Sequence, residues 1–123
     1  MPRTLLFVYG TLKRGMKNHS LLAGQILLQT ANTKPLYRLL DLGPYPGLIA
    51  NDKQGLSIAG ELWNVDQATL QRLDHFEGVP ALFQRHTIQI ESFSAEAQSY
   101  YYVGKNAGSD CGSSWPPHGD SAC

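Results

Sequence analysis

The chain has 123 residues, a length that fits one domain, and its ten Lys or Arg balance its ten Asp or Glu to a formal net charge of zero. Because the basic residues form no dense run, we expect neither nucleic acid nor an anionic membrane surface as a partner. Apolar runs such as Leu5 to Val8 fall far short of the roughly 20 residues that span a bilayer, and no apolar signal region opens the chain, so we expect a cytoplasmic protein.

The first predicted strand, Leu5 to Tyr9, runs into the glycine-containing turn Tyr9-Gly10-Thr11-Leu12. A strand that stops at glycine leaves backbone N–H groups unpaired, and these can bind an anion or an oxyanion. The same pattern also fits an ordinary strand exit. Lys13, Arg14 and Lys17 follow the turn, either to attract an anionic substrate or as a solvated loop.

A proline and glycine cluster at 43–47 interrupts the next predicted strands, which cover 26–33, 36–40 and 48–50. Before them, Asn18 or Ser20 is placed to cap a short helical turn. Two prolines and two glycines within five residues predict a stiff, irregular loop. This loop either walls a pocket with Tyr45, Pro46 and Gly47 or forms a hairpin corner.

Residues 57–65 alternate in polarity and predict a strand. Gly60 inside this strand indicates a bulge or a close approach of another backbone. Glu61 shares a face with Trp63 and Val65, which makes it a second candidate carboxylate. The alternative for Glu61 is an edge-strand charge that faces water.

The principal candidate carboxylate is Glu77, at the end of a predicted helix over Gln67 to Phe76. Asp66 is placed to cap this helix, and Gly78 followed by Pro80 ends it. The helix dipole and the apolar neighbours of Glu77 both disfavour a charged carboxylate, so its pKa should rise toward that of a general base. A solvated residue in the last helical turn is the alternative.

The last predicted strands cover 83–91 and 98–103. In a strand, Tyr100 and Tyr102 point to one face and Tyr101 to the other. One of these hydroxyls can reach a substrate, and we select Tyr102 for this role. The alternative is a tyrosine that is half-buried in the sheet. Together the patterns predict an α+β fold with one main helix, short flanking helices and about seven short strands, closed into a small mixed β-barrel.

Composition changes after residue 104, where glycine, serine and proline become frequent and periodicity ends. We therefore expect a globular domain over 1–104 and a flexible tail over 105–123. Both cysteines, Cys111 and Cys123, lie in this tail, and the four histidines lack ligand spacing. Neither a disulfide framework nor a metal site is indicated.

Four motifs, in this order, resemble the γ-glutamylcyclotransferase-like or AIG2-like superfamily. They are Phe7-Val8-Tyr9-Gly10-Thr11-Leu12-Lys13, Pro44-Tyr45-Pro46-Gly47-Leu48, Gly60-Glu61-Leu62-Trp63 and Leu73-Asp74-His75-Phe76-Glu77. The run from Leu73 to Arg85 is most similar to the γ-glutamylamine cyclotransferase branch, although Phe83 stands where that branch often has tyrosine. The resemblance covers about Leu5 to Val103 and leaves the tail without a counterpart.

This resemblance implies a compact α+β fold around a small mixed barrel and a cyclotransferase that releases 5-oxoproline from a small γ-glutamyl substrate. The Tyr9-Gly10-Thr11-Leu12 positions match the family's substrate-binding loop, and Glu77 matches its general acid/base. No metal or organic cofactor is implied, and we expect a monomer.

The implied chemistry agrees with the candidate residues. The substrate's own α-amine attacks its γ-carbonyl, so no protein nucleophile is needed and Glu77 has only to move protons. A γ-glutamyl amide is the expected substrate. A γ-glutamyl dipeptide, glutathione, or non-catalytic metabolite binding in the same fold are the alternatives.

Overall fold

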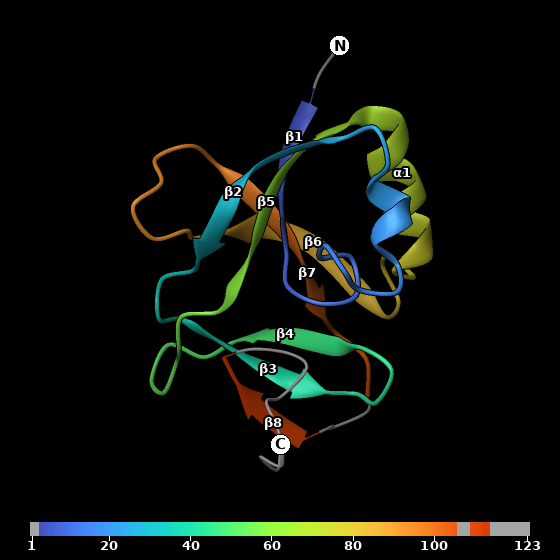
Figure 1. The fold of residues 1–123 in the computed structure, drawn as a ribbon. Coiled ribbons are helices and arrows are strands. Elements are labelled where there is room, and N and C mark those ends of the chain that lie inside the picture. The colour runs from blue at the N-terminus through green and yellow to red at the C-terminus, as the bar shows by residue number, and fades with distance from the viewer. Residues whose placement is uncertain (1–2, 106–108, 114–123) are drawn as a thin grey trace.

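The computed structural model describes residues 3–105 and 109–113, and it consists of a mixed β-sheet with one α-helix packed against it (Figure 1). The sequence-predicted elements are present, with ends that differ from the predicted ones by at most three residues. In chain order the elements are β1 Arg3–Val8, the 3₁₀ turn η1 His19–Leu22, β2 Ile26–Asn32, β3 Tyr37–Asp41, β4 Pro46–Ala50, β5 Ala59–Asp66, α1 Gln67–Phe76, β6 Phe83–Ile88, β7 Ala97–Tyr102 and β8 Ser109–Gly112.

The strand order of the described sheet is β2-β5-β1-β7-β4-β3-β8, with β6 paired to β7 outside this path. Strand β6 runs antiparallel to β7 along its whole length. On its other side, β7 is parallel to β1 near its start, at Gln98, and parallel to β4 near its end, at Tyr101. Strands β1 and β4 therefore separate where β7 passes from one to the other, and this fork is where the pocket described below opens.

The predicted closure into a barrel is wrong, whereas the α+β class is confirmed. A closed barrel needs each strand to be paired along both edges. Here one edge of β7 is divided between two strands, and β6 is joined to the end of β2 only through an isolated bridge between Thr33 and Ile90. The sheet consequently stays open, with β2 and β8 at the ends of its path.

The helix α1 begins and ends where its sequence predicts. The Asp66 side chain accepts a hydrogen bond from the Thr69 N–H at 2.8 Å and caps the N-terminus. Leu70 and Leu73 are buried against the sheet, and Gly78 stops the helix with a φ of +68°. No helix in the described part of the chain is long and apolar enough to cross a membrane.

Residues of β1 alternate between two hydrophobic clusters, one on each face of the sheet. Leu6 and Val8 pack with the α1 residues Leu70 and Leu73. Phe7 packs in a second cluster with Leu39, Leu48, Ile58 and Leu62, and Leu5 packs against that cluster. Strand β1 is thus buried on both faces, which holds its C-terminal end, and the turn that follows, at the centre of the molecule.

Strand β8 lies inside the segment for which composition predicted a flexible tail. It pairs antiparallel with the edge of β3 that β4 leaves free, and Arg38 on β3 binds Asp110 at 2.6 Å. An edge strand offers unpaired N–H and C=O groups that bond a neighbouring segment almost regardless of its side chains, so composition alone missed this pairing. The rest of the predicted tail, 106–108 and 114–123, lies outside the described residues.

Candidate active site

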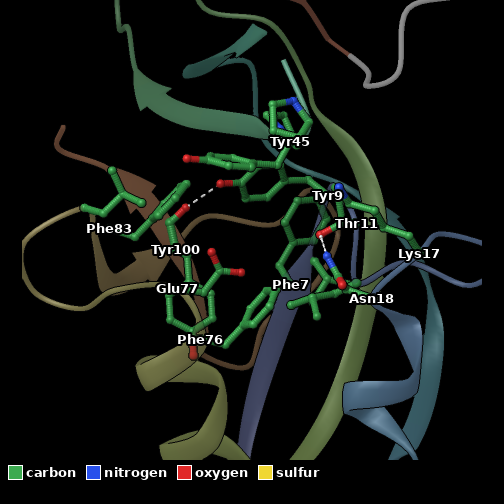
Figure 2. Close-up of a pocket in the computed structure, with 16 residues that line it drawn as sticks. Phe7, Tyr9, Thr11, Lys17, Asn18, Tyr45, Phe76, Glu77, Phe83 and Tyr100 are labelled. Carbon is green, nitrogen blue, oxygen red and sulfur yellow. Dashed lines mark hydrogen bonds between the residues drawn. The ribbon is translucent and has the colours of Figure 1, made fainter. Parts of the chain in front are cut away.

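A pocket of about 410 Å³ opens at the fork between β1 and β4 (Figure 2). Its wall comes from the end of β1 and the following turn (residues 7–12), the β3–β4 turn (44–46), the end of α1 (76–77), residues 82–83 and Tyr100 of β7, with Lys17 and Asn18 completing it. Six segments far apart in sequence therefore meet here, which is the arrangement expected of a ligand site.

Glu77 is the acidic residue among the described residues that line this pocket, and Figure 2 shows its carboxylate pointing into the cavity. It caps the C-terminus of α1, where its N–H is bonded to the Leu73 carbonyl at 2.9 Å. None of the hydrogen bonds found among the described residues uses its carboxylate. Burial raises the pKa of Glu77 to about 7, in the direction that the sequence predicted.

The Tyr9 hydroxyl, just after the end of β1, forms hydrogen bonds with both β7 and β4. It donates to the Tyr100 carbonyl of β7 at 2.7 Å, a bond dashed in Figure 2, and accepts from the Leu48 N–H of β4 at 3.1 Å. Burial, followed by the charge of Glu77, raises the pKa of Tyr9 well above its usual value. Tyr9 is therefore a neutral residue of the pocket lining whose hydroxyl links the end of β1 to both β7 and β4.

Replacing Tyr9 by Phe should destabilise the fold by about 2 to 3 kcal/mol, because a buried carbonyl and a buried N–H lose their shared partner. Urea denaturation at pH 7 measures this loss. Tyr101→Phe is the matched control, since its hydroxyl bonds the Thr87 carbonyl at an exposed site and should cost about 1 kcal/mol or less. Equal stability of the two variants would contradict the bridging role of Tyr9.

The turn after β1 lines the pocket with Gly10, Thr11 and Leu12. In the turn and loop hydrogen bonds of the described residues, the carbonyls of Gly10 and Thr11 are used but the N–H groups of Gly10, Thr11 and Leu12 are not. The Asn18 side chain donates a hydrogen bond to Thr11 Oγ1 at 3.0 Å, and the Asn18 backbone N–H donates to the Thr11 carbonyl at 3.0 Å. These two bonds fix the turn. These free donors can bind an anion.

Gly10 is required by packing more than by backbone angle. A Cβ at this position would lie 2.6 Å from Cγ of Pro46, so the β1 turn and the β3–β4 turn touch across the pocket. The sequence left two alternatives for the loop around Pro46, a hairpin corner and a pocket wall. The structure shows that it is both.

Glu61, the second candidate carboxylate, does not line the pocket and does not face water. It is 7% exposed on the interior strand β5. Its carboxylate accepts from the backbone N–H and the Nε of Arg14 and from Nε1 of Trp63, all at 3.1 Å. Burial alone would raise the pKa of Glu61, but these bonds outweigh it and lower the pKa. Glu61 therefore anchors the loop that follows the Gly10 turn.

A polar cluster fixes α1 to the sheet one turn before Glu77. Asp74 accepts from Arg85 Nε at 2.8 Å, from Arg85 Nη2 at 2.9 Å and from the Tyr100 hydroxyl at 2.7 Å. Arg85 and Tyr100 are directly opposite in the β6–β7 ladder. Burial alone would raise the pKa of Asp74, but the hydrogen bonds from Arg85 and Tyr100 outweigh it and hold the pKa below its usual range.

Arg85→Gln should destabilise the protein by about 1 to 2 kcal/mol at pH 7, because it leaves a half-buried carboxylate without its cation. Since the Asp74 pKa is lowered in the folded state, this contribution is present above the unfolded pKa and is lost as the pH falls through the folded one. The difference from wild type should therefore shrink in denaturation measured at acid pH. Arg72→Gln, on the exposed face of α1, is the control and should change stability little.

Two residues expected in the site lie outside the pocket lining, namely Gly47 and Tyr102. A Cβ on Gly47 would lie 2.8 Å from Cβ of Tyr102, so these residues let β4 and β7 pack closely. Tyr100, on the same face of β7, lines the pocket instead. The alternation of side chains along β7 predicted the correct face of the strand. Which tyrosine on that face lies at the fork depends on the register between β7 and β4. Phe7, Asn18, Phe76 and Leu82 also line the pocket but were not among the site residues that the sequence predicted.

Of the three cations after the Gly10 turn, Lys17 lines the pocket. Arg14 is bonded to Glu61. Burial lowers the pKa of Lys13, which does not line the pocket. Of the three, Lys17 is therefore the cation that reaches the pocket.

The fold agrees with the comparisons to known proteins. A family model described as gamma-glutamyl cyclotransferase, AIG2-like, matches residues 6–120. The chain belongs to this family, which confirms the resemblance seen in its motifs. The match also extends past residue 104, so the predicted tail does have a counterpart in the family.

Particular relatives carry cyclotransferase names. A putative gamma-glutamylcyclotransferase of Vibrio cholerae is 47% identical over 85 residues, 69% of this chain and 71% of the relative. The human gamma-glutamylaminecyclotransferase is 36% identical over 99 residues, which cover 71% of this chain but 61% of the human protein. The crystal structure of a mouse AIG2-like protein superposes with a TM-score of 0.78 at 27% identity, covering 87% of this chain and 82% of the mouse chain.

Proposed function

We propose that this protein is a γ-glutamylamine cyclotransferase, which converts a γ-glutamyl amide into 5-oxoproline and a free amine. The observation that carries the proposal is the Glu77 carboxylate, with a pKa of about 7, facing a pocket whose other side offers the N–H groups of the Gly10 turn. Several vertebrate relatives, at 34 to 37% identity, are named gamma-glutamylaminecyclotransferase. Their names support the substrate class.

Glu77 acts as the general acid/base in the proposed reaction. It takes a proton from the substrate's α-ammonium, and the resulting amine attacks the γ-carbonyl carbon to close a five-membered ring. Breaking the bond between that carbon and the amide nitrogen then expels the leaving amine. Of the three ammonium protons, one stays on the lactam nitrogen and two pass, through Glu77, to the leaving amine, which departs as an ammonium ion.

The remaining pocket residues bind and orient the substrate. The N–H groups of Gly10 to Leu12, with Lys17 beside them, can hold the α-carboxylate or the oxyanion that develops on the γ-carbonyl. Folding the flexible glutamyl chain into its ring-closing conformation supplies much of the rate, because effective molarities for well-oriented intramolecular attack are large. Tyr9 and the ring of Tyr100 form the wall against which the chain folds.

A cyclotransferase acting on γ-glutamyl dipeptides or glutathione is the second candidate, favoured by the broader name of the Vibrio cholerae relative. In a dipeptide such as γ-glutamyl-alanine, the carbon next to the scissile nitrogen carries a carboxylate. In the pocket that charge would lie close to Glu77, where like charges repel. An amine with a CH₂ at this position avoids the repulsion, so the pocket favours the amide class.

Release of 5-oxoproline from γ-glutamyl-lysine isopeptide, γ-glutamyl-alanine and glutathione tests the proposal. We expect turnover of the isopeptide at least tenfold faster than of the other two, since one misplaced charge costs roughly this much or more. Faster turnover of γ-glutamyl-alanine or glutathione would establish the second candidate. No turnover of any of the three substrates, together with measurable binding of a γ-glutamyl compound, would indicate a non-catalytic metabolite-binding protein.

A further inference from the structure

The two ends of the pocket differ in polarity. Figure 2 shows Lys17 and Asn18 on one side of Glu77 and Phe83 on the other. The Lys17 side also holds the N–H groups of the Gly10 turn. Among the described residues that line the pocket, Lys17 and Glu77 are the charged ones. A charged group at the Phe83 end would therefore find no opposite charge except Glu77 itself.

Two large apolar side chains of the pocket lining are exposed. Phe76 is 47% exposed and Leu82, the neighbour of Phe83 in the chain, is 36% exposed. Single exposed apolar residues are common on protein surfaces and need no explanation. Here, however, both line the same cavity as Glu77, Phe83, Tyr45 and Pro44, and together these apolar side chains form its apolar wall.

Phe83 contributes a ring without a hydroxyl group to this wall. Its ring packs against Tyr102 and Tyr45, with ring centroids 5.5 and 6.0 Å apart. Leu82 is held in place because its N–H bonds the Gly78 carbonyl and its carbonyl accepts from Val103, both within 3.0 Å. The wall is therefore a built surface of the fold and continuous with the proposed catalytic site.

We propose, on the basis of the function proposed above, that this wall binds the leaving amine and that the preferred amine is an uncharged alkyl or arylalkyl chain. The glutamyl part lies at the polar end, since its α-carboxylate matches Lys17 and the free N–H groups. The leaving group then extends across Glu77 onto Phe76, Leu82 and Phe83. These three residues determine specificity for the leaving group, because burying its CH₂ groups is favourable while burying a charge there is not.

Two isosteric substrates separate charge from size. The γ-glutamyl n-pentylamide and the γ-glutamyl 4-aminobutylamide have equally long chains, one ending in CH₃ and the other in NH₃⁺. We expect kcat/KM for the pentylamide to exceed that for the aminobutylamide by about tenfold. It should also exceed that for the γ-glutamyl methylamide by about tenfold, because four further carbons meet a half-exposed wall and each adds about a factor of two, less than full burial would give.

The variant Leu82→Ser should reduce both ratios to within about threefold of unity, with thermal melting confirming that the variant is folded. Leu56→Ser is the matched control, since Leu56 is 38% exposed and lies outside the pocket, and it should leave both ratios unchanged.

The outcomes distinguish this inference from the proposed function. Release of 5-oxoproline and amine from all three amides at equal rates would overturn the apolar subsite and leave the cyclotransferase proposal standing. Equal ratios in wild type and Leu82→Ser would overturn the role of this wall. No release from any amide would overturn the proposed function, and the subsite with it.

Discussion

Replacing Glu77 by Gln is expected to lower kcat for 5-oxoproline release by about a thousandfold, within the range typical for loss of a general acid/base. Glutamine has nearly the same size and can still form hydrogen bonds in the pocket, but it cannot accept a proton from the substrate's ammonium group. Because the pocket and the Gly10 turn are untouched, substrate binding should change far less than turnover. A loss confined to KM would therefore contradict the role of Glu77 in proton transfer.

The measurement compares wild type, Glu77→Gln and Glu91→Gln on the best γ-glutamyl amide. Glu91 is exposed and outside the pocket, so its variant removes a carboxylate without altering the site. In the wild type, kcat/KM should rise with pH up to about 7, where Glu77 becomes ionised and able to act as a base. Undiminished activity in Glu77→Gln would rule out this mechanism.

The same substitution should stabilise the fold at pH 8, by about 3 kcal/mol before any screening by water in the open pocket. Burial raises the pKa of Glu77 from 4.5 to about 7, so the folded state binds a proton more tightly than the unfolded state does. Wild-type stability therefore falls as the pH rises from about 4.5 to 7 and levels off above that. Glutamine does not ionise, so the variant escapes this loss.

Denaturation of both proteins from pH 5 to 8 measures the difference directly. The excess stability of Glu77→Gln should grow with pH and reach its plateau above pH 7. Other titrating groups, such as Asp74, affect both proteins alike and cancel in the difference. An excess that is independent of pH would mean that Glu77 ionises in the folded protein as it does in water. A variant that is inactive but more stable would show that the carboxylate is kept for function at the expense of stability.

Local patterns in the sequence were sufficient for the elements that carry the proposed chemistry. The cap at Asp66, the spacing of Leu70 and Leu73 and the stop at Gly78 predicted the bounds of α1 and thus the place of Glu77 at its end. The strand ending at Gly10 predicted the turn with free N–H groups. These features depend on neighbours within a few residues in the chain, so they can be read without the tertiary structure.

Features that depend on distant segments could not be read in this way. Whether Tyr100 or Tyr102 reaches the pocket is set by the register of β7 against β4, and whether Glu61 faces water is set by the strands on either side of β5. The Asp74–Arg85 pair and the pairing of β8 with β3 likewise join residues that no local pattern links. In each case the deciding interaction forms only when the sheet assembles.

The sequence by itself determined the position of Glu77 at the end of α1, because the cap at Asp66, the apolar spacing and the stop at Gly78 are local properties. The tertiary structure alone decided that this carboxylate is buried in a pocket, opposite the Gly10 turn and beside the apolar wall of Phe76, Leu82 and Phe83. It did so through the fork at β7, where β1 and β4 separate and leave a cavity between segments that are distant in the sequence.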